Sequence, residues 1–336
     1  MANIIITDYC NLKCPYCFAE DMIASNKNDD NKYISYENFL KILNWMVAQF
    51  PQYDEQIGII GGEPTLHPMF FDILSSTHEY SVRMNTNGLL FSNGVELEKW
   101  LPIIAGYKIN VLINCNSPKY QSKENYQKTI NTILRAESMG LIDNDRIRLG
   151  CNIYLGLEDY SYFWNEMVDK ARVHIVRCSV VSPGGCYMDE WRKPEKKEEY
   201  YTALKSRFLD FINEAKKRNI VVSVDCNNIP PCYFTDEEKK LILSVVEHSP
   251  MTFCKPAIDI DKNLHVTSCF GTYDINKDAN EFLVTDFANI ESVKKYLLYS
   301  KNLPKVYANN YGKCSDCNLY KQFECQGGCL SFSGLV

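Results

Sequence analysis

The chain has 336 residues, of which 46% are hydrophobic, and a formal net charge of -6. No apolar run approaches the roughly 18 residues of a membrane span, and an acidic balance does not favour a broad nucleic-acid surface. These values predict a globular protein with no membrane and no nucleic-acid partner, and the length favours two structural units.

The first residues and the cysteines indicate the compartment. Cys10 follows so soon after Met1 that no signal peptide fits before it, so we expect a cytoplasmic protein. The chain has 15 cysteines. Because disulfides are rare in a reducing compartment, this number favours metal or cluster ligation.

Short apolar runs alternate with amphipathic stretches as far as residue 225, which is typical of repeated strand–helix units. Strands are expected at 3–7, 56–61, 80–86, 108–114, 146–154 and 173–181. These units predict an α/β fold, a partial (β/α)6 barrel of the TIM type over residues 1–225.

Two helices of this pattern are well marked. One is expected over 35–49, with Ser35 as its N-cap. Its predicted apolar face consists of Phe39, Leu40, Leu43, Met46 and Val47. The other is expected over 195–218 and leads to a closing strand at 220–224.

The sequence changes character after the expected barrel. From Cys226 onward cysteines are dense, and prolines interrupt the periodic pattern. The stretch between Cys254 and Cys269 favours a β-hairpin. We predict a domain boundary near residue 225 and a small cysteine-rich α+β domain over 226–336.

Three cysteines stand on one loop directly after the first expected strand. Cys10-Asn-Leu-Lys-Cys14-Pro-Tyr-Cys17 has three and then two residues between successive cysteines, with Tyr16 before the last. In spacing and position this motif resembles that of the radical SAM superfamily. The resemblance implies that Cys10, Cys14 and Cys17 ligate a 4Fe-4S cluster whose open iron binds S-adenosylmethionine (SAM). A partial zinc site or chance clustering is the alternative.

The resemblance also implies the reaction. One electron from the cluster cleaves SAM to a 5'-deoxyadenosyl radical, which takes a hydrogen atom from an unreactive C–H bond. A reductant such as flavodoxin or ferredoxin is an implied partner.

A second signal follows the second expected strand. Gly61-Gly62-Glu63-Pro64 is similar to the family's Gly-Gly-Glu-Pro element, in which glycines let the backbone approach a ligand closely. Its carbonyls, with the Glu63 carboxylate nearby, are expected to receive the methionyl ammonium. Taken alone, the tetrapeptide reads as an ordinary strand-to-helix turn.

Polar residues at the later strand ends are weaker candidates. In radical SAM proteins such positions bind the ribose and the methionyl carboxylate, and an arginine fork matches two carboxylate oxygens. The resemblance therefore implies cofactor contacts, together with Tyr16, from Asn85, Asn114, Asn152 and Arg177. The same strand ends hold Thr86, Asn87, Gly88 and Asn116. Each of these residues taken singly is equally consistent with a turn or a structural hydrogen bond.

Eight cysteines follow residue 225, namely Cys226, Cys232, Cys254, Cys269, Cys314, Cys317, Cys325 and Cys329. Their pattern resembles the SPASM extension of radical SAM enzymes, which binds auxiliary 4Fe-4S clusters. The chain departs from it in three ways. Seven residues separate Cys317 from Cys325 where the family has five, the glycine expected before Cys269 is absent, and no cysteine follows Cys329.

The absent last cysteine leaves the ligand pairing open. We expect two auxiliary clusters, one on Cys254, Cys269 and Cys329 and one on Cys314, Cys317 and Cys325, each completed by Cys226 or Cys232. A single auxiliary cluster, the smaller twitch arrangement, is one alternative. A structural zinc site on Cys314, Cys317, Cys325 and Cys329 is the other.

The remaining cysteines are Cys115, Cys151, Cys178 and Cys186. Buried cysteine behaves as a small hydrophobic residue, so we expect core packing. Cys186, in a loop near the expected substrate mouth, is also a candidate radical or proton partner.

Resembling enzymes with a SPASM extension often modify peptides. We therefore expect a radical SAM oxidoreductase of RiPP maturation that makes a thioether or C–C crosslink, or oxidises a side chain, in a ribosomal peptide or protein. A dehydrogenase or mutase of a small metabolite is the alternative, favoured because no peptide-binding module precedes the barrel. The segment from Gly61 to Pro64 disfavours a cluster carrier without turnover. Phe270 stands where sulfatase maturases have an aspartate, which disfavours that activity.

Overall fold

The structure is a computed structural model of the chain. It describes residues 2–17, 19, 20, 23, 31–49, 56–89, 94–157, 159–181, 191, 193–226, 229–251, 257–269, 282–297, 314–329 and 331. Within these ranges no helix is both long and apolar enough to cross a membrane.

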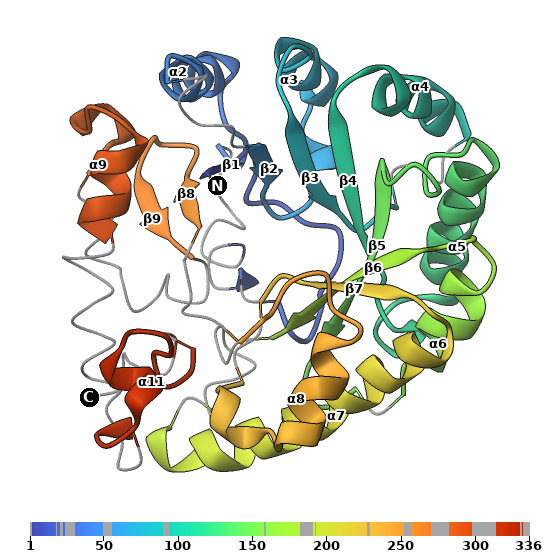
Figure 1. The fold of residues 1–336 in the computed structure, drawn as a ribbon. Coiled ribbons are helices and arrows are strands. Elements are labelled where there is room, and N and C mark those ends of the chain that lie inside the picture. The colour runs from blue at the N-terminus through green and yellow to red at the C-terminus, as the bar shows by residue number, and fades with distance from the viewer. Residues whose placement is uncertain are drawn as a thin grey trace.

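A nine-stranded sheet organises the fold (Figure 1). The strand order is β7-β6-β5-β4-β3-β2-β1-β8-β9, and every neighbouring pair is parallel except β8 with β9. The strands are β1 Ala2–Ile5, β2 Ile57–Ile60, β3 Val82–Thr86, β4 Ile109–Asn114, β5 Ile147–Ile153, β6 Ile175–Val180, β7 Val221–Val224, β8 Ile258–Ile260 and β9 Val266–Ser268. The first seven confirm the strands expected from the sequence.

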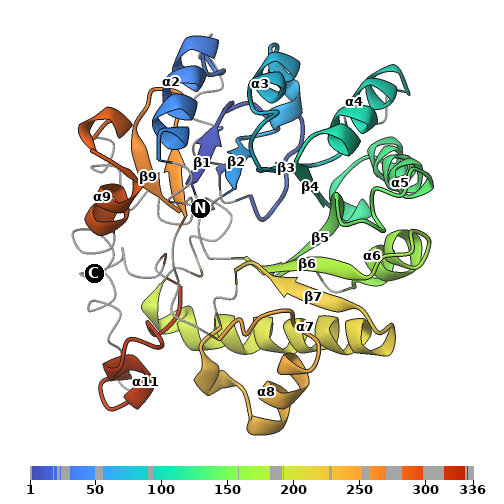
Figure 2. The ribbon, with the colours of Figure 1, turned by 45° about the horizontal axis from the view of Figure 1, so that its top comes forward.

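Helices lie on the outer side of the curved sheet, as in a partial barrel of the TIM type (Figure 2). The helices of the described residues are α2 Tyr36–Val47, α3 Phe70–Ser76, α4 Gly94–Gly106, α5 Lys123–Ser138, α6 Ser161–Phe163, α7 Lys197–Lys217, α8 Asp236–Leu243, α9 Ile290–Lys295 and α11 Asn318–Lys321. Of these, α11 lies apart from the sheet (Figures 1 and 2). Both α2 and α7 confirm helices expected from the sequence, and the predicted fold class is correct.

The start of α2 shows why this segment is helical. Ser35 Oγ accepts a hydrogen bond from Asn38 N at 3.1 Å, so the predicted N-cap is confirmed. The buried face consists of Phe39, Ile42, Leu43 and Met46. Leu40 and Val47, predicted on this face, are only partly buried, because the core-facing stripe repeats at i, i+3, i+4 and i+7.

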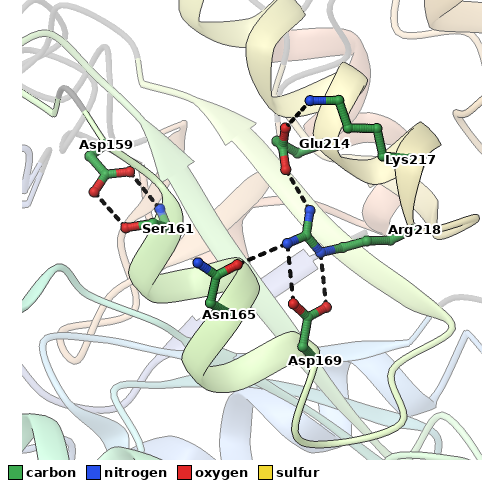
Figure 3. A network of polar contacts seen from close by, with 7 residues as sticks. All are labelled: Asp159, Ser161, Asn165, Asp169, Glu214, Lys217 and Arg218. Carbon is green, nitrogen blue, oxygen red and sulfur yellow. Dashed lines mark hydrogen bonds and ion pairs between the residues drawn. The ribbon is translucent and has the colours of Figure 1, made fainter.

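Arg218, just past the end of α7, ties this helix to the segment that follows α6 (Figure 3). Its guanidinium donates to Asp169 at 2.9 and 3.1 Å and to Asn165 Oδ1 at 2.9 Å, and it pairs with Glu214 within α7. A polar network therefore fixes these outer helices to each other.

The C-terminal third of the chain returns to the barrel. β8 pairs with β1, placing Ile258 opposite Ala2, and forms with β9 the hairpin predicted between Cys254 and Cys269. β1 consequently has a strand on both sides. One sheet thus contains strands from both sides of residue 225. The domain boundary near this residue stays a prediction.

Candidate active site

The loop after β1 carries Cys10, Cys14 and Cys17 at the carboxyl edge of the sheet, where such folds place their active sites. Cys17 N donates to Cys14 O at 3.1 Å, and Leu12 N donates to Cys10 Sγ at 3.5 Å. Burial raises the pKa of Cys10 to about 11 and that of Cys14 to about 12, and the neighbouring thiols add to both shifts. The three thiols therefore lie together, and cluster binding must release their protons.

The segment 61–64 lies directly against this cluster loop. Gly62 N donates to Thr7 O at 2.8 Å. A Cβ at Gly61 would lie 2.5 Å from Thr7 O, and one at Gly62 would lie 2.3 Å from Tyr9 O. The absence of a side chain at these two glycines lets segment 61–64 pack closely on the backbone of the cluster loop. From the sequence, we expected these glycines to allow the close approach of a ligand.

Glu63 joins the ends of β2 and β3. Its buried carboxylate accepts hydrogen bonds from Thr65 Oγ1 and Thr86 Oγ1, both at 2.6 Å, and from Asn87 N at 2.8 Å. Burial raises the pKa of Glu63, and these hydrogen bonds oppose the rise. The Glu63 carboxylate thus already accepts hydrogen bonds from protein groups. The backbone carbonyls of the two preceding glycines therefore remain the candidate acceptors for the methionyl ammonium.

Two asparagines at neighbouring strand ends have unsatisfied oxygens. Asn85 lies near the end of β3 and Asn114 ends β4, and within the described part of the chain neither buried Oδ1 atom has a hydrogen-bond partner. An unsatisfied buried acceptor costs about 1–3 kcal/mol. The ammonium and ribose hydroxyls of SAM are donors of the kind these atoms lack, so the residues present fit this cofactor.

Tyr16 anchors the cluster loop to the barrel. Its hydroxyl donates to Asn116 Oδ1, and Cys14 Sγ lies 3.8 Å from the same oxygen. The Tyr16 ring centroid lies 4.4 Å from that of Tyr154, and burial raises the pKa of Tyr16. The structure therefore gives Tyr16 a positioning role, and its contact with SAM stays a prediction.

The arginine of β6 is engaged by protein groups. Arg177 Nη2 lies 2.7 Å from Asp225 Oδ2, and Nη1 donates to Asn152 Oδ1 at 2.8 Å. The Arg177 guanidinium holds the pKa of Asp225 below its usual value, and Arg83 on β3 adds to this. The guanidinium fork expected at the methionyl carboxylate binds Asp225 in this structure, and the contact of Arg177 with SAM stays a prediction. Sequence reasoning did not find Asp225, because one acidic residue after a strand forms no motif.

The structure separates the C-terminal cysteines into different neighbourhoods. Cys325 interacts electrostatically with Cys232, Cys314 and Cys317, whereas Cys226 interacts with Arg177 of the barrel. Cys269 directly follows β9, Cys329 is buried, and Cys254 lies outside the described residues. Nowhere in the described ranges are three or more His, Cys, Asp or Glu side chains arranged to hold a single metal ion. The thiols are thus neighbours without the spacing of a single-ion site.

A buried lysine lies among these cysteines. Lys197, at the start of α7, is 9% exposed, and its ammonium interacts with the thiols of Cys232, Cys314, Cys325 and Cys329. Burial lowers the pKa of Lys197, and the thiols oppose that shift. No sequence signal marks this residue, because its helix is rich in exposed lysine and glutamate.

Three of the four remaining cysteines are core residues. Cys115, Cys151 and Cys178 are buried in the main hydrophobic cluster, which confirms their predicted packing role. Burial raises the pKa of Cys151 to about 12, as expected for an inert thiol. Cys186 lies outside the described residues.

Comparison with known proteins identifies the family. A model described as the radical SAM superfamily matches residues 4–171, half of the chain. The chain belongs to the radical SAM superfamily. Radical SAM enzymes use a 4Fe-4S cluster and SAM, and in this chain the cluster would be held by Cys10, Cys14 and Cys17 and would supply the electron that cleaves SAM.

Curated relatives of this radical SAM protein share its barrel portion. The chain is 25% identical over 173 residues to a GTP 3',8-cyclase of Synechocystis sp., covering 51% of this chain and 50% of that protein. It is 34% identical over 91 residues to the tungsten-containing aldehyde ferredoxin oxidoreductase cofactor-modifying protein of Pyrococcus furiosus, covering 26% and 24%. The chain thus spans half the length, or less, of these relatives.

Solved structures share the fold over nearly the whole chain. Streptococcus suis SuiB bound to precursor peptide SuiA gives a TM-score of 0.60 at 16% identity, over 98% of this chain and 71% of that chain. The enzyme anSMEcpe with bound AdoMet and Cp18Cys peptide gives 0.56 at 18% identity, over 98% and 88%. The likeness therefore extends through the cysteine-rich C-terminal segment.

Proposed function

We propose that this radical SAM enzyme oxidatively modifies a ribosomal peptide or protein, by a thioether or C–C crosslink or by side-chain oxidation. One observation carries the proposal. A second group of thiols, Cys232, Cys314, Cys317 and Cys325, forms a neighbourhood beside α7 of the barrel. Hydrogen abstraction followed by bond formation leaves one electron on the substrate, and auxiliary 4Fe-4S clusters in segment 226–336 can accept it.

The fold likeness supports a peptide as the substrate. The SuiB and anSMEcpe structures that resemble this chain each contain a peptide. Both likenesses cover 98% of this chain, so they include the segment with the second thiol group. The reductant and the cytoplasmic location expected from the sequence stay predictions.

A reaction on a small metabolite is the second candidate. The relative from Synechocystis sp. is named a GTP 3',8-cyclase, and its match to this chain covers 173 residues. Arg177 of β6 and Arg83 of β3 both interact with Asp225, although β5 and β4 lie between these two strands in the sheet. Two cations around one carboxylate leave a net positive charge there, which suits an anionic ligand.

Turnover assays with both substrate classes separate these candidates. The reconstituted protein is reduced without oxygen and incubated with SAM and either GTP or the peptides encoded by short reading frames beside its gene. Mass spectrometry then follows 5'-deoxyadenosine and each substrate. We expect peptide-dependent 5'-deoxyadenosine and a peptide that has lost two hydrogens, with Cys14→Ala as the inactive control.

The other outcomes are equally decisive. A GTP-derived product, with every peptide unchanged, would reject the peptide proposal in favour of the second candidate. Intact clusters that yield no 5'-deoxyadenosine with either substrate would reject both and leave a cluster carrier.

A further inference from the structure

Two segments that are distant in the sequence meet on one face of the first turns of α7. This face, which carries Lys197 and Tyr201, is called the platform. Lys197 and Tyr201 lie four residues apart, so they share one face of the helix. The fully buried Tyr201 ring has its centroid 5.3 Å from that of Tyr233, and Cys329 N donates to Tyr201 Oη at 2.7 Å. The segments around residues 232 and 329 therefore meet on this face. In both ribbon views the segment that includes α11 lies near the first turns of α7 (Figures 1 and 2).

A glycine makes the second of these approaches possible. A Cβ at Gly328 would lie 2.2 Å from Tyr201 Oη, and the φ of Gly328 is +120°, which other residues rarely adopt. The Gly-Gly before Cys329 thus lets the C-terminal segment close onto the helix. This closure brings the cysteines of residues 314–329 to the platform.

Four thiols gather beside the platform. Cys314 and Cys317 lie on one turn, in which Cys317 N donates to Cys314 O at 3.1 Å. Cys325 interacts electrostatically with both of them and with Cys232. Lys197 interacts with Cys314, Cys325 and Cys232 from the helix side. Both Cys325 and Lys197 therefore lie near Cys232, which places Cys232 with the cysteines of the C-terminal segment.

The two cysteines that the sequence left as alternatives occupy different places. Cys232 lies in the turn η7, Pro231–Tyr233, which packs on α7. Cys226 lies two residues after the end of β7. Its carbonyl accepts a hydrogen bond from Val180 N at 2.7 Å, and it interacts with Arg177. Of the two, Cys232 is the one that adjoins Cys314 and Cys325.

We infer that Cys232 is the fourth protein ligand of an auxiliary 4Fe-4S cluster whose other ligands are Cys314, Cys317 and Cys325. This inference rests on the proposed function, which requires an auxiliary cluster. In this arrangement a cysteine from before the hairpin supplies the fourth ligand. Ligation by four thiolates releases four thiol protons and leaves no iron open for substrate, so this cluster serves electron transfer.

The test uses a parent variant, Cys10→Ala/Cys14→Ala/Cys17→Ala, so that every remaining iron belongs to auxiliary clusters. Into this parent we introduce Cys232→Ala, with Cys226→Ala as the matched control and Cys314→Ala as the positive reference. Iron and sulfide are counted after anaerobic reconstitution, and Mössbauer and EPR spectra are recorded. Circular dichroism verifies that each variant is folded, and the milder Cys232→Ser replaces any Cys232→Ala protein that is not.

We expect Cys232→Ala and Cys314→Ala to lose the same spectral component, about four irons per chain, while Cys226→Ala retains it. Loss of that component in Cys314→Ala, with unchanged iron and spectra in Cys232→Ala and Cys232→Ser, overturns the ligand assignment alone. A parent variant that holds no iron, or zinc in its place, overturns both the assignment and the auxiliary cluster of the proposed function.

Discussion

Lys262 Nζ lies 2.9 Å from Asp8 Oδ2, in an ion pair whose side chains are 7% and 3% exposed. Lys262 belongs to the turn between β8 and β9, and Asp8 lies two residues before Cys10. The same Nζ atom donates to Asn31 O at 2.7 Å. This buried pair connects the C-terminal hairpin to the loop of the radical SAM cysteines.

Removing the cation of this pair should destabilise the protein. We expect Lys262→Met to lower the free energy of unfolding by about 3–5 kcal/mol, because the Asp8 carboxylate stays buried without its partner. Lys262→Met combined with Asp8→Asn should recover most of this loss. Urea unfolding of the apo-protein measures both variants and the wild type, and a Lys262→Met protein as stable as the wild type would contradict the structural role.

Gly62→Ala should prevent assembly of the radical SAM cluster. The added Cβ would meet Tyr9 O at 2.3 Å and Cys10 Cβ at 3.1 Å, so the cluster loop must move. We expect the reconstituted variant to lack about four irons per chain relative to the wild type. Gly106→Ala is the matched control, since no atom lies within 4 Å of its Cβ position. Equal iron in both variants would refute the prediction.

Asn114→Leu should weaken SAM binding without weakening the fold. The Asn114 oxygen has no partner in the described part of the free protein, so its replacement by an apolar group of similar size removes an unsatisfied acceptor. We expect at least a roughly tenfold higher Kd for SAM, which corresponds to about 1.4 kcal/mol. Calorimetry measures this Kd and thermal melting measures stability. Asn116→Leu, which removes the acceptor of Tyr16, should instead lower the melting temperature.

Asp259 should make stability depend on pH. Burial raises the pKa of this β8 carboxyl from 3.8 to about 6, although Asn3 Nδ2 donates to it at 2.6 Å. Between these two values the folded state holds a proton that the unfolded state has lost. This contribution to stability is therefore fully present below pH 3.8 and is lost as the pH rises through about 6.

Asp259→Asn removes this titration. We expect the variant to be more stable than the wild type by up to about 3 kcal/mol above pH 7 and to match it near pH 4. Urea unfolding of the apo-protein at both pH values measures the difference. A constant difference between the two proteins across this range would reject the assignment.

Lys197→Met should lower the reduction potential of the proposed auxiliary cluster. Loss of a buried positive charge beside the ligands disfavours the added electron, by roughly 1–2 kcal/mol at an effective dielectric constant of about 20. This corresponds to a shift on the order of 40–90 mV for one electron. EPR-monitored redox titration measures the potential. Lys197→Arg should retain it. The control Lys205→Met should retain it too, because Lys205, also on α7, pairs with Glu238 of α8.

The sequence predicted the barrel well because most of its strands are short, predominantly apolar segments. Ile57–Ile60 and Ile109–Asn114 are bounded by turn residues, so both were recognisable without any long-range information. The placement of the three motif cysteines followed from the same reasoning, since a loop directly after a parallel strand lies at the carboxyl edge of the sheet.

The remaining features depend on contacts between residues far apart in the chain. β8 has three residues and pairs with β1, more than 250 positions away, so no local pattern indicates its partner. The ion pair of Arg177 with Asp225 was equally hidden, because an arginine within a strand has the same sequence pattern whether it binds a ligand or a carboxylate. The neighbourhood of Cys232 and Cys325 depends on how both segments pack against Tyr201.

The pairing of β8 with β1 also bears on how the chain can be divided. If the polypeptide ended at residue 225, β1 would become an edge strand with unpaired amide and carbonyl groups along its length. Such an edge is a template for aggregation, and it would border the loop that carries the motif cysteines. The hairpin of β8 and β9 therefore protects the edge of β1, the strand that leads into the loop of the motif cysteines.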